Sequence, residues 1–128
     1  FLGPVPESGV ALPRDAAAGV QARPCEVSLD AVEYWRRPEV LCLVAKFVPE
    51  ALCELVGQLR DGLAARGFQP ESRPFRAHLT LARKVIHPVS PVTFEPVHWP
   101  VADFALVESV TDRSGSVYTP LARWPLRA

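Results

Sequence analysis

The most informative stretch of the chain is Arg73-Pro74-Phe75-Arg76-Ala77-His78-Leu79-Thr80-Leu81-Ala82-Arg83. Residues 77 to 85 are predicted to form a strand. Because side chains alternate faces along a strand, His78 and Thr80 point one way while Leu79 and Leu81 point the other. The leucines are therefore expected to anchor the strand in the core and to hold the polar pair over a cleft.

The polar pair carries chemistry that suits a phosphate ester. His78 can exchange a proton near neutral pH. Thr80 is stiff at χ1, so its hydroxyl can be a fixed hydrogen-bond donor to a phosphate oxygen. Arg83 lies on the opposite side of an ideal strand from His78, so it reaches the same cleft only if the strand bends or has ended. A histidine and a threonine at this spacing often occur by chance, so the pair alone favours a structural role.

The rest of the chain is predicted to alternate between helical and extended segments. We expect a short helix around 14–22, limited by Pro13, and a longer helix that opens at Pro49 and stops at Gly67. A half-exposed strand over 25–32 precedes a turn at 35–38 and a buried central strand over 40–47. A loop over 68–76 precedes the strand at 77–85, and a long loop over 87–100 follows it. A hairpin pairs 103–111 with 116–121. This order indicates a single α+β domain over 1–128 with a mainly antiparallel sheet.

The composition excludes several classes of protein. The chain has 14 basic and 14 acidic residues in 128, so no global field draws it to nucleic acid. Around His78 the sequence has a local cluster of cations, Arg73, Arg76, Arg83 and Lys84, with only Glu71 near them. This cluster is interpreted as a phosphate site or as a solvated face. No apolar run is long enough to span a bilayer. The three cysteines have no metal-ligand spacing. Cys42 and Cys53 are expected to be reduced, buried thiols of a cytoplasmic protein without metal or cofactor.

The stretch from Pro74 to Arg83 closely resembles the second signature motif of the RNA 2′,3′-cyclic phosphodiesterases, also called 2′-5′ RNA ligases. These are bacterial-type two-histidine (2H) phosphoesterases with a LigT-like fold. Ala77 stands where the family usually has proline. Further segments resemble the family in its own order: Phe1-Leu2-Gly3, Arg37-Pro38-Glu39-Val40-Leu41, Leu106-Val107-Glu108-Ser109, Gly115, Tyr118 and Trp124-Pro125-Leu126.

The resemblance implies a bilobal fold with mainly antiparallel sheets flanked by helices, and two histidine-x-threonine motifs facing one cleft. It implies hydrolysis of a 2′,3′-cyclic phosphate RNA end or a cyclic nucleotide to a 2′-phosphate, without metal, by a monomer, and reversal as 2′-5′ ligation. His78 and Thr80 are the expected catalytic residues, with His78 as the base, although the acid role stays open. Arg83 and Arg76 are expected to steer phosphate, while Phe75 stacks on a base or packs in the core.

The first motif of the family does not occur in this sequence. The chain has no methionine and begins with Phe1, so we expect an upstream segment that carries the first histidine. His87 and His98 do not replace it, because neither is followed by the required threonine; both are expected to be surface or packing residues. Tyr118 and Trp124 are expected to pack. Two other hypotheses remain: a nucleotide- or RNA-binding module without chemistry, and an inactive fragment that completes its sheet with another chain.

Overall fold

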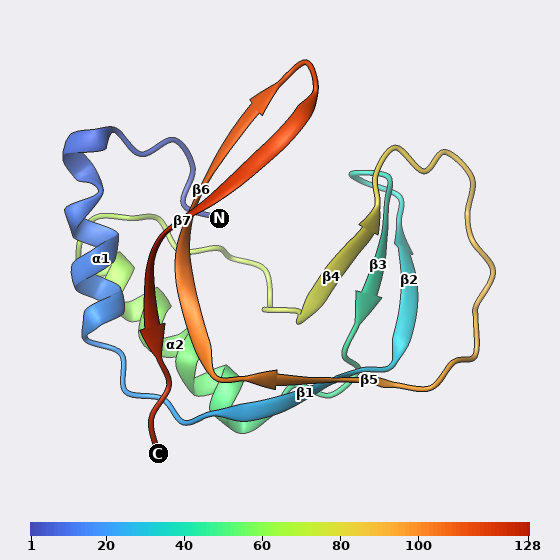
Figure 1. Cartoon of the computed structure of the whole chain (residues 1–128), viewed down its shortest axis with the longest axis horizontal. Helices are drawn as coiled ribbons and strands as arrows, with labels where there is room; N and C mark the ends of the chain where they lie inside the picture. Colours follow the sequence, from blue (N-terminus) through green and yellow to red (C-terminus); the bar gives the residue numbers. More distant parts are fainter.

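The computed structural model describes residues 1–128 and has an α+β architecture (Figure 1). Its elements, in chain order, are η1 (Glu7–Gly9), α1 (Ala11–Ala18), β1 (Cys25–Leu29), β2 (Ala31–Trp35), β3 (Val40–Val44), α2 (Glu50–Ala64), β4 (His78–Ala82), β5 (Val97–Val101), β6 (Asp103–Asp112) and β7 (Gly115–Pro125). Neither helix has the length and the apolar character that crossing a bilayer requires. The predicted fold class and the antiparallel pairing are confirmed.

The strands form three small antiparallel sheets with the orders β1-β5, β2-β3-β4 and β6-β7. Figure 1 shows β2-β3-β4 on one side of the molecule and the β6-β7 hairpin with the two helices on the other. The β1-β5 pair runs along the base between them. Within its sheet, β4 is the edge strand that is nearest the hairpin.

Helix α2 follows the apolar pattern that predicted it. Leu52 and Leu55 recur at helical spacing and are buried. The helix ends at Ala64, and Gly67 then takes a φ of +88°, which a residue without Cβ adopts at little cost. The amide of Phe68 donates to the carbonyl of Leu63 at 3.1 Å, so a late carbonyl of the helix is satisfied.

Helix α1 begins earlier than predicted. It starts at Ala11 and includes Pro13 in its first turn, where an amide would lack a helical partner in any case. Proline was therefore a poor guide to the start of this helix. Its Ala16 packs against Gly62 of α2, because a Cβ at Gly62 would lie 3.4 Å from the Cβ of Ala16.

Two features of the strands correct the sequence predictions. The strand expected over 25–32 is interrupted at Asp30, where the chain passes from pairing with β5 to pairing with β3; the Asp30 side chain accepts a hydrogen bond from the Lys46 amide at 3.0 Å. The loop expected over 87–100 contains most of strand β5, which includes Pro100. This strand pairs only with β1, so a proline nitrogen can sit on its unpaired edge without the loss of a ladder hydrogen bond.

The apolar core has two parts. The larger cluster joins strands β1 and β3 to helix α2, and its nine buried members are Ala22, Val27, Leu29, Leu43, Ala45, Leu52, Leu55, Ala77 and Leu126. A smaller cluster of Val40, Cys42 and Val44 lies on β3, with Ala31 and Trp35 packed against it. Since consecutive β3 residues alternate faces, the two clusters cover opposite faces of this strand.

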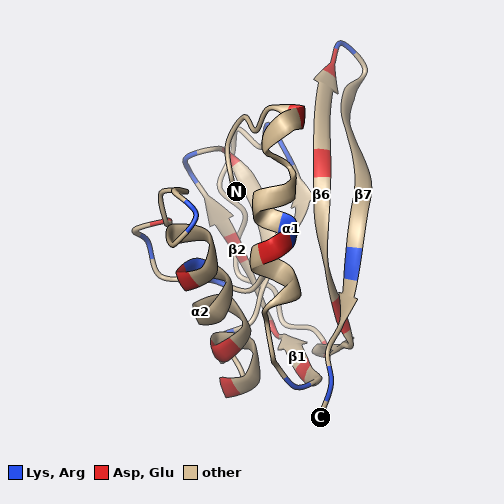
Figure 2. Cartoon of the chain, turned by 90° about the vertical axis from the view of Figure 1, so that its left-hand side faces the viewer, with Lys and Arg blue, Asp and Glu red and all other residues tan.

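Charged residues of both signs are interspersed over the helices and strands (Figure 2). This agrees with the formal net charge of zero. Any attraction for an anionic substrate must therefore be local rather than a property of the whole surface.

Candidate active site

Strand β4 brings His78 and Thr80 onto a polar face of the three-stranded sheet. Directly paired residues of antiparallel strands share a face. Glu33 pairs with Cys42, and Cys42 pairs with Thr80, so these three side chains form a row across the sheet. His78 and Trp35 lie two residues along their strands from this row and therefore belong to the same face. The small core cluster on β3 lies on this same face, between the side chains of β2 and those of β4.

The ring of His78 is held from two directions. Its Nδ1 lies 2.8 Å from the carbonyl oxygen of Arg76. A carbonyl can only accept a hydrogen bond, so Nδ1 carries the proton and, in the neutral ring, Nε2 is the basic nitrogen. The Trp35 ring packs beside it with centroids 4.7 Å apart and an interplanar angle of 52°. The imidazole is otherwise exposed, so Nε2 can meet a substrate.

Thr80 is half-buried and has little competition for its hydroxyl. Its only polar contact is with the thiol of Cys42, with Oγ1 and Sγ 4.0 Å apart. Sulfur is a weak hydrogen-bond partner. Cys42 itself is fully buried, as predicted for a reduced thiol, whereas Cys53, which was also expected to be buried, is exposed on α2. The Thr80 hydroxyl remains available to a phosphate oxygen.

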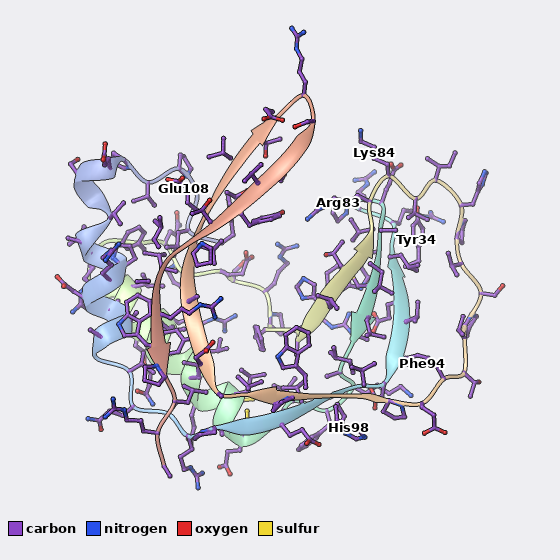
Figure 3. The ribbon with its side chains drawn as sticks, viewed as in Figure 1. Tyr34, Arg83, Lys84, Phe94, His98 and Glu108 are labelled. Carbon is purple, nitrogen blue, oxygen red and sulfur yellow. The ribbon has the colours of Figure 1, made fainter.

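Arg83 reaches the space beside β4 because the strand has ended. Strand β4 stops at Ala82, and Lys84 takes a φ of +57°, which turns the chain. Figure 3 shows the Arg83 side chain leaving the end of β4 toward the β6-β7 hairpin. Its Nη2 lies 3.5 Å from the hydroxyl of Tyr118 on β7. From the sequence, Arg83 is expected to reach the side of His78 only if the strand bends or has ended, and the strand has ended before Arg83.

A pocket of about 370 Å³ opens along the free edge of β4. Its walls are Leu79, Thr80, Leu81, Ala82, Arg83 and Tyr118. It therefore combines a hydroxyl donor and a cation with apolar walls, and Thr80 and Arg83 are brought together there. His78 lies on the same strand, two residues before Thr80.

The expectation that Leu79 and Leu81 anchor β4 in the core was wrong. Leu79 is 41% exposed and Leu81 is 51% exposed. Leu79 does pair with the buried Leu43 on the face opposite His78, as alternation predicted. The larger core, however, ends at β3 and does not extend over the edge strand. The leucines line the pocket instead.

Two of the four cations near His78 in the sequence have acidic partners. Arg73 pairs with Glu71 at 3.0 Å. Arg76 makes a two-pronged ion pair with Glu33, with Nη1 and Oε1 2.9 Å apart. The hydrogen bonds from Arg76 hold the pKa of the Glu33 carboxyl below its usual value, and the pair raises the pKa of Arg76. Glu71 is thus not the only acid in the cluster, and no ion pair engages Arg83.

The remaining predicted residues lie at the margin of the site. Phe75 is 40% exposed in the loop before β4, so it is not a core residue, and a role in stacking on a base stays a prediction. The role of Arg76 in steering phosphate also stays a prediction, although Glu33 already occupies its guanidinium.

Sequence reasoning missed three residues of this region. Glu33 and Trp35 precede His78 by more than 40 positions, and only the register of β2, β3 and β4 brings them together. Tyr118 was expected to pack, but it is 57% exposed and forms part of the pocket wall. Trp124 does pack, with its ring stacked on Phe104 at 5.5 Å. The resemblance of the hairpin to the family was the only signal for Tyr118.

The other two histidines lie elsewhere, as expected. His98 is on β5, where Figure 3 shows it at the base of the molecule and pointing away from β4. Its Nδ1 lies 3.1 Å from a Glu26 carboxylate oxygen and 3.2 Å from the Ser28 hydroxyl. His87 is exposed in the loop after β4. No three His, Cys, Asp or Glu side chains are grouped as a metal site would require.

A larger hollow of about 670 Å³ lies near the C-terminus, but it offers less chemistry. Its walls come from the end of α1, the segment that follows it, Glu54 of α2 and the C-terminal residues. They include no histidine and no hydroxyl-bearing side chain. The pocket at β4 is therefore the better candidate for a reaction at phosphorus.

Comparison with known proteins gives consistent similarities. The family model described as LigT like Phosphoesterase matches residues 44–118. The RNA 2′,3′-cyclic phosphodiesterase of Escherichia coli K12 is 35% identical over 104 residues, which cover 78% of this chain and 57% of that protein. A crystal structure of a phosphoesterase superposes with a TM-score of 0.86 at 30% identity, and one of E. coli LigT in complex with 3′-AMP with a TM-score of 0.83 at 30% identity. Both superpositions cover 100% of this chain and 74% of the other chain.

Proposed function

Since the chain belongs to the LigT-like phosphoesterase family, we propose that it takes part in hydrolysing 2′,3′-cyclic phosphate ends of RNA to terminal 2′-phosphates. The chain spans 57% of the length of the E. coli RNA 2′,3′-cyclic phosphodiesterase that it resembles. The observation that carries the proposal is the geometry of His78. With Nδ1–H bound to the Arg76 carbonyl, the neutral ring presents Nε2 as a base beside the Thr80 hydroxyl.

In the proposed reaction, Nε2 of His78 accepts a proton from water, and the water oxygen attacks phosphorus. The bond between phosphorus and the 3′-oxygen breaks, and a second group protonates that oxygen. The products are a 2′-phosphate and a 3′-hydroxyl. The second group is proposed to be the histidine of the family's first motif, because His78 is the only histidine of this chain followed by x-threonine. The opposite assignment of acid and base has the same geometry.

Thr80 and Arg83 are proposed to bind the phosphate. Negative charge grows on the non-bridging oxygens in the transition state, and preorganised donors stabilise it there. The Thr80 hydroxyl and the unpaired Arg83 guanidinium both line the pocket. Phe75 and Arg76 are proposed to lie at the margin, where Phe75 stacks on an unpaired base. No step in this scheme uses a metal or a cofactor.

The same chemistry permits ligation. A 5′-hydroxyl of a second RNA attacks the cyclic phosphate in place of water, the 3′-oxygen leaves, and a 2′-5′ linkage forms. We also propose that the protein works as a monomer of one domain in the cytoplasm. The three cysteines are free thiols in the structure, as a reducing compartment would keep them.

A test needs a short RNA that ends in a 2′,3′-cyclic phosphate, with the product followed by phosphorus NMR. The chain and a form extended at its N-terminus are each compared with their His78→Ala variants. The matched control is His98→Ala, since His98 is an exposed histidine at the base of the molecule that points away from β4. Conversion to a 2′-phosphate that is lost only in His78→Ala supports the proposal.

The rival function is an RNA- or nucleotide-binding module of the same fold, in keeping with the 3′-AMP complex of E. coli LigT. If neither form turns over the RNA but both bind it, the module is the correct interpretation and the hydrolase proposal is wrong. If His98→Ala abolishes turnover and His78→Ala does not, the site has been misplaced.

A further inference from the structure

Glu33 is the one acidic side chain on the face of His78 that the proposed reaction does not use. It lies on β2, two strands away from β4. Both of its carboxylate oxygens accept hydrogen bonds from Arg76, and Oε1 also accepts one from the Trp35 indole Nε1 at 3.3 Å. One carboxylate thus binds the two residues that flank the catalytic ring.

Each of these two residues contacts His78 directly. The backbone carbonyl of Arg76 accepts the Nδ1 proton at 2.8 Å. The Trp35 ring packs against the imidazole at 4.7 Å, and the Arg76 guanidinium lies 5.5 Å from the centre of the same Trp35 ring. The four residues therefore form a closed set of contacts, in which Glu33 accepts hydrogen bonds from both residues that contact His78.

Arg76 needs such a tether because it lies in an irregular segment. The residues from 68 to 77 form no helix or strand. The nearest ladder-like bond is from the Ala45 amide to the Ala77 carbonyl at 3.1 Å, one residue beyond the carbonyl that orients His78. A two-pronged bond from a guanidinium to a carboxylate fixes orientation as well as distance. By holding the Arg76 guanidinium, the Glu33 carboxylate therefore also restrains the backbone of Arg76.

The ion pair is poorly suited to a purely stabilising role. The side chains of Arg76 and Glu33 are 49% and 36% exposed. Ion pairs at this exposure contribute little to folding. Their orienting effect on a neighbouring ring does not depend on a large stabilisation energy, because a tautomer is selected by a single well-placed acceptor.

We propose that Glu33 is a positioning residue, which holds the Arg76 carbonyl and the Trp35 ring against His78 so that Nδ1 is protonated and Nε2 faces the substrate. The catalytic consequence rests on the proposed function. The tautomer of His78 does not, because it is a property of the protein alone.

The experiment measures the nitrogen-15 chemical shifts of the His78 ring at a pH where the ring is neutral. The parent protein is compared with Glu33→Ala, which removes all three hydrogen bonds, and with Glu33→Gln, which keeps the size of the side chain. The matched control is Glu26→Ala, because Glu26 also contacts a histidine from a neighbouring strand, but that histidine is His98. The His87 signals serve as an internal reference in every variant, and those of His98 in all but Glu26→Ala.

We expect the parent and Glu26→Ala to show an Nδ1–H tautomer at His78. In Glu33→Ala the nitrogen-15 shifts of His78 should move toward the average of the two tautomers. In Glu33→Gln these shifts should lie between those of the parent and those of Glu33→Ala. Where turnover is measurable, kcat should fall about tenfold in Glu33→Ala while KM changes less than twofold. If Glu33→Ala does not fold, Glu33→Gln alone decides.

An unchanged His78 tautomer in the folded Glu33 variants overturns the proposal, whatever the activity. A shifted tautomer in a protein that shows no turnover supports the positioning role and counts only against the hydrolase function. A fall in kcat with an unchanged tautomer shows that Glu33 acts in another way, and the proposal is then wrong.

Discussion

Replacing Thr80 with valine separates a catalytic role of this side chain from a structural one. Valine has nearly the same shape as threonine and the same β-branched preference for a strand. The change removes only the hydroxyl, whose sole contact is the Cys42 thiol at 4.0 Å. The expected effects on folding and on catalysis therefore differ greatly in size.

The loss of stability should be small. A typical intramolecular hydrogen bond contributes about 0.5–1.5 kcal/mol, and a long contact with sulfur should contribute less than that. We expect the free energy of unfolding to change by less than about 1 kcal/mol. In contrast, removal of one donor to a charge that develops in the transition state lowers kcat by about 10²–10³, or about 2.7–4 kcal/mol.

The measurement pairs thermal unfolding with initial rates on an RNA that ends in a 2′,3′-cyclic phosphate. Thr80→Ser is the control, since it keeps the hydroxyl and loses only a methyl group. It should retain most of the kcat that Thr80→Val loses. A folded Thr80→Val protein with a kcat within threefold of the parent would refute the donor role. A loss of stability above about 2 kcal/mol would instead point to a structural role that exceeds any single hydrogen bond.

Further predictions concern the fold and its pH dependence. Gly62→Ala should raise the free energy of unfolding by about 0.5–1 kcal/mol, and with it the melting temperature, because the new Cβ meets Ala16 at an ordinary 3.4 Å and helix propensity improves. Gly62→Leu should lower the free energy of unfolding by about 1–3 kcal/mol, because the larger side chain displaces α1. Equal effects of the two changes would contradict the packing of α1 on α2. Leu55→Ala, at a residue 4% exposed in the larger core, should cost about 2–5 kcal/mol in urea unfolding, and a loss below 1 kcal/mol would place Leu55 outside that core. The pKa of Glu33 is lowered in the folded state, so its contribution is present above the unfolded pKa of about 4.3 and is lost as pH falls through the lower folded value. Because the pair is partly exposed, this contribution should be at most about 1 kcal/mol. The free energy of unfolding should therefore differ less between pH 6 and pH 3 in Glu33→Gln than in the parent, by no more than that amount. A larger difference in Glu33→Gln would contradict the lowered pKa of Glu33.

Local sequence patterns predicted the elements whose stability is itself local. The leucine spacing that defines α2 and the alternation that defines β4 report on single elements, and both elements were found. The hairpin of β6 and β7 was also predictable, because its turn residues and its strands are contiguous in the sequence. The resemblance of residues 74–83 to a family motif then singled out β4 as the candidate functional strand, which periodicity alone could not do.

Long-range pairing accounts for what the sequence did not reveal. Strand β5 carries a proline and no clear alternation, and it becomes a strand because β1, about 70 residues earlier, offers a partner. Glu33 and Arg76 are 43 residues apart. The sequence around His78 therefore shows the cation Arg76 but not the carboxylate that pairs with it. Leu79 and Leu81 have the pattern of core residues, but the position of β4 at a sheet edge leaves them in a pocket wall.

The requirements of the proposed reaction and the exposed apolar surface concern the same region, the space beside β4. The proposed hydrolysis needs a second proton-transfer group opposite His78, and neither His87 nor His98 lies there. The accessible surface is 9365 Å², whereas a compact monomer of this mass has roughly 6,700 Å². Part of the excess lies on the leucines of β4 and on both faces of the hairpin, where Val107, Val110, Val117 and Tyr118 are exposed. The Tyr118 face of the hairpin and the leucines of β4 border the pocket, so the apolar area exposed there lies beside the place where the 3′-oxygen has to be protonated in the proposed reaction.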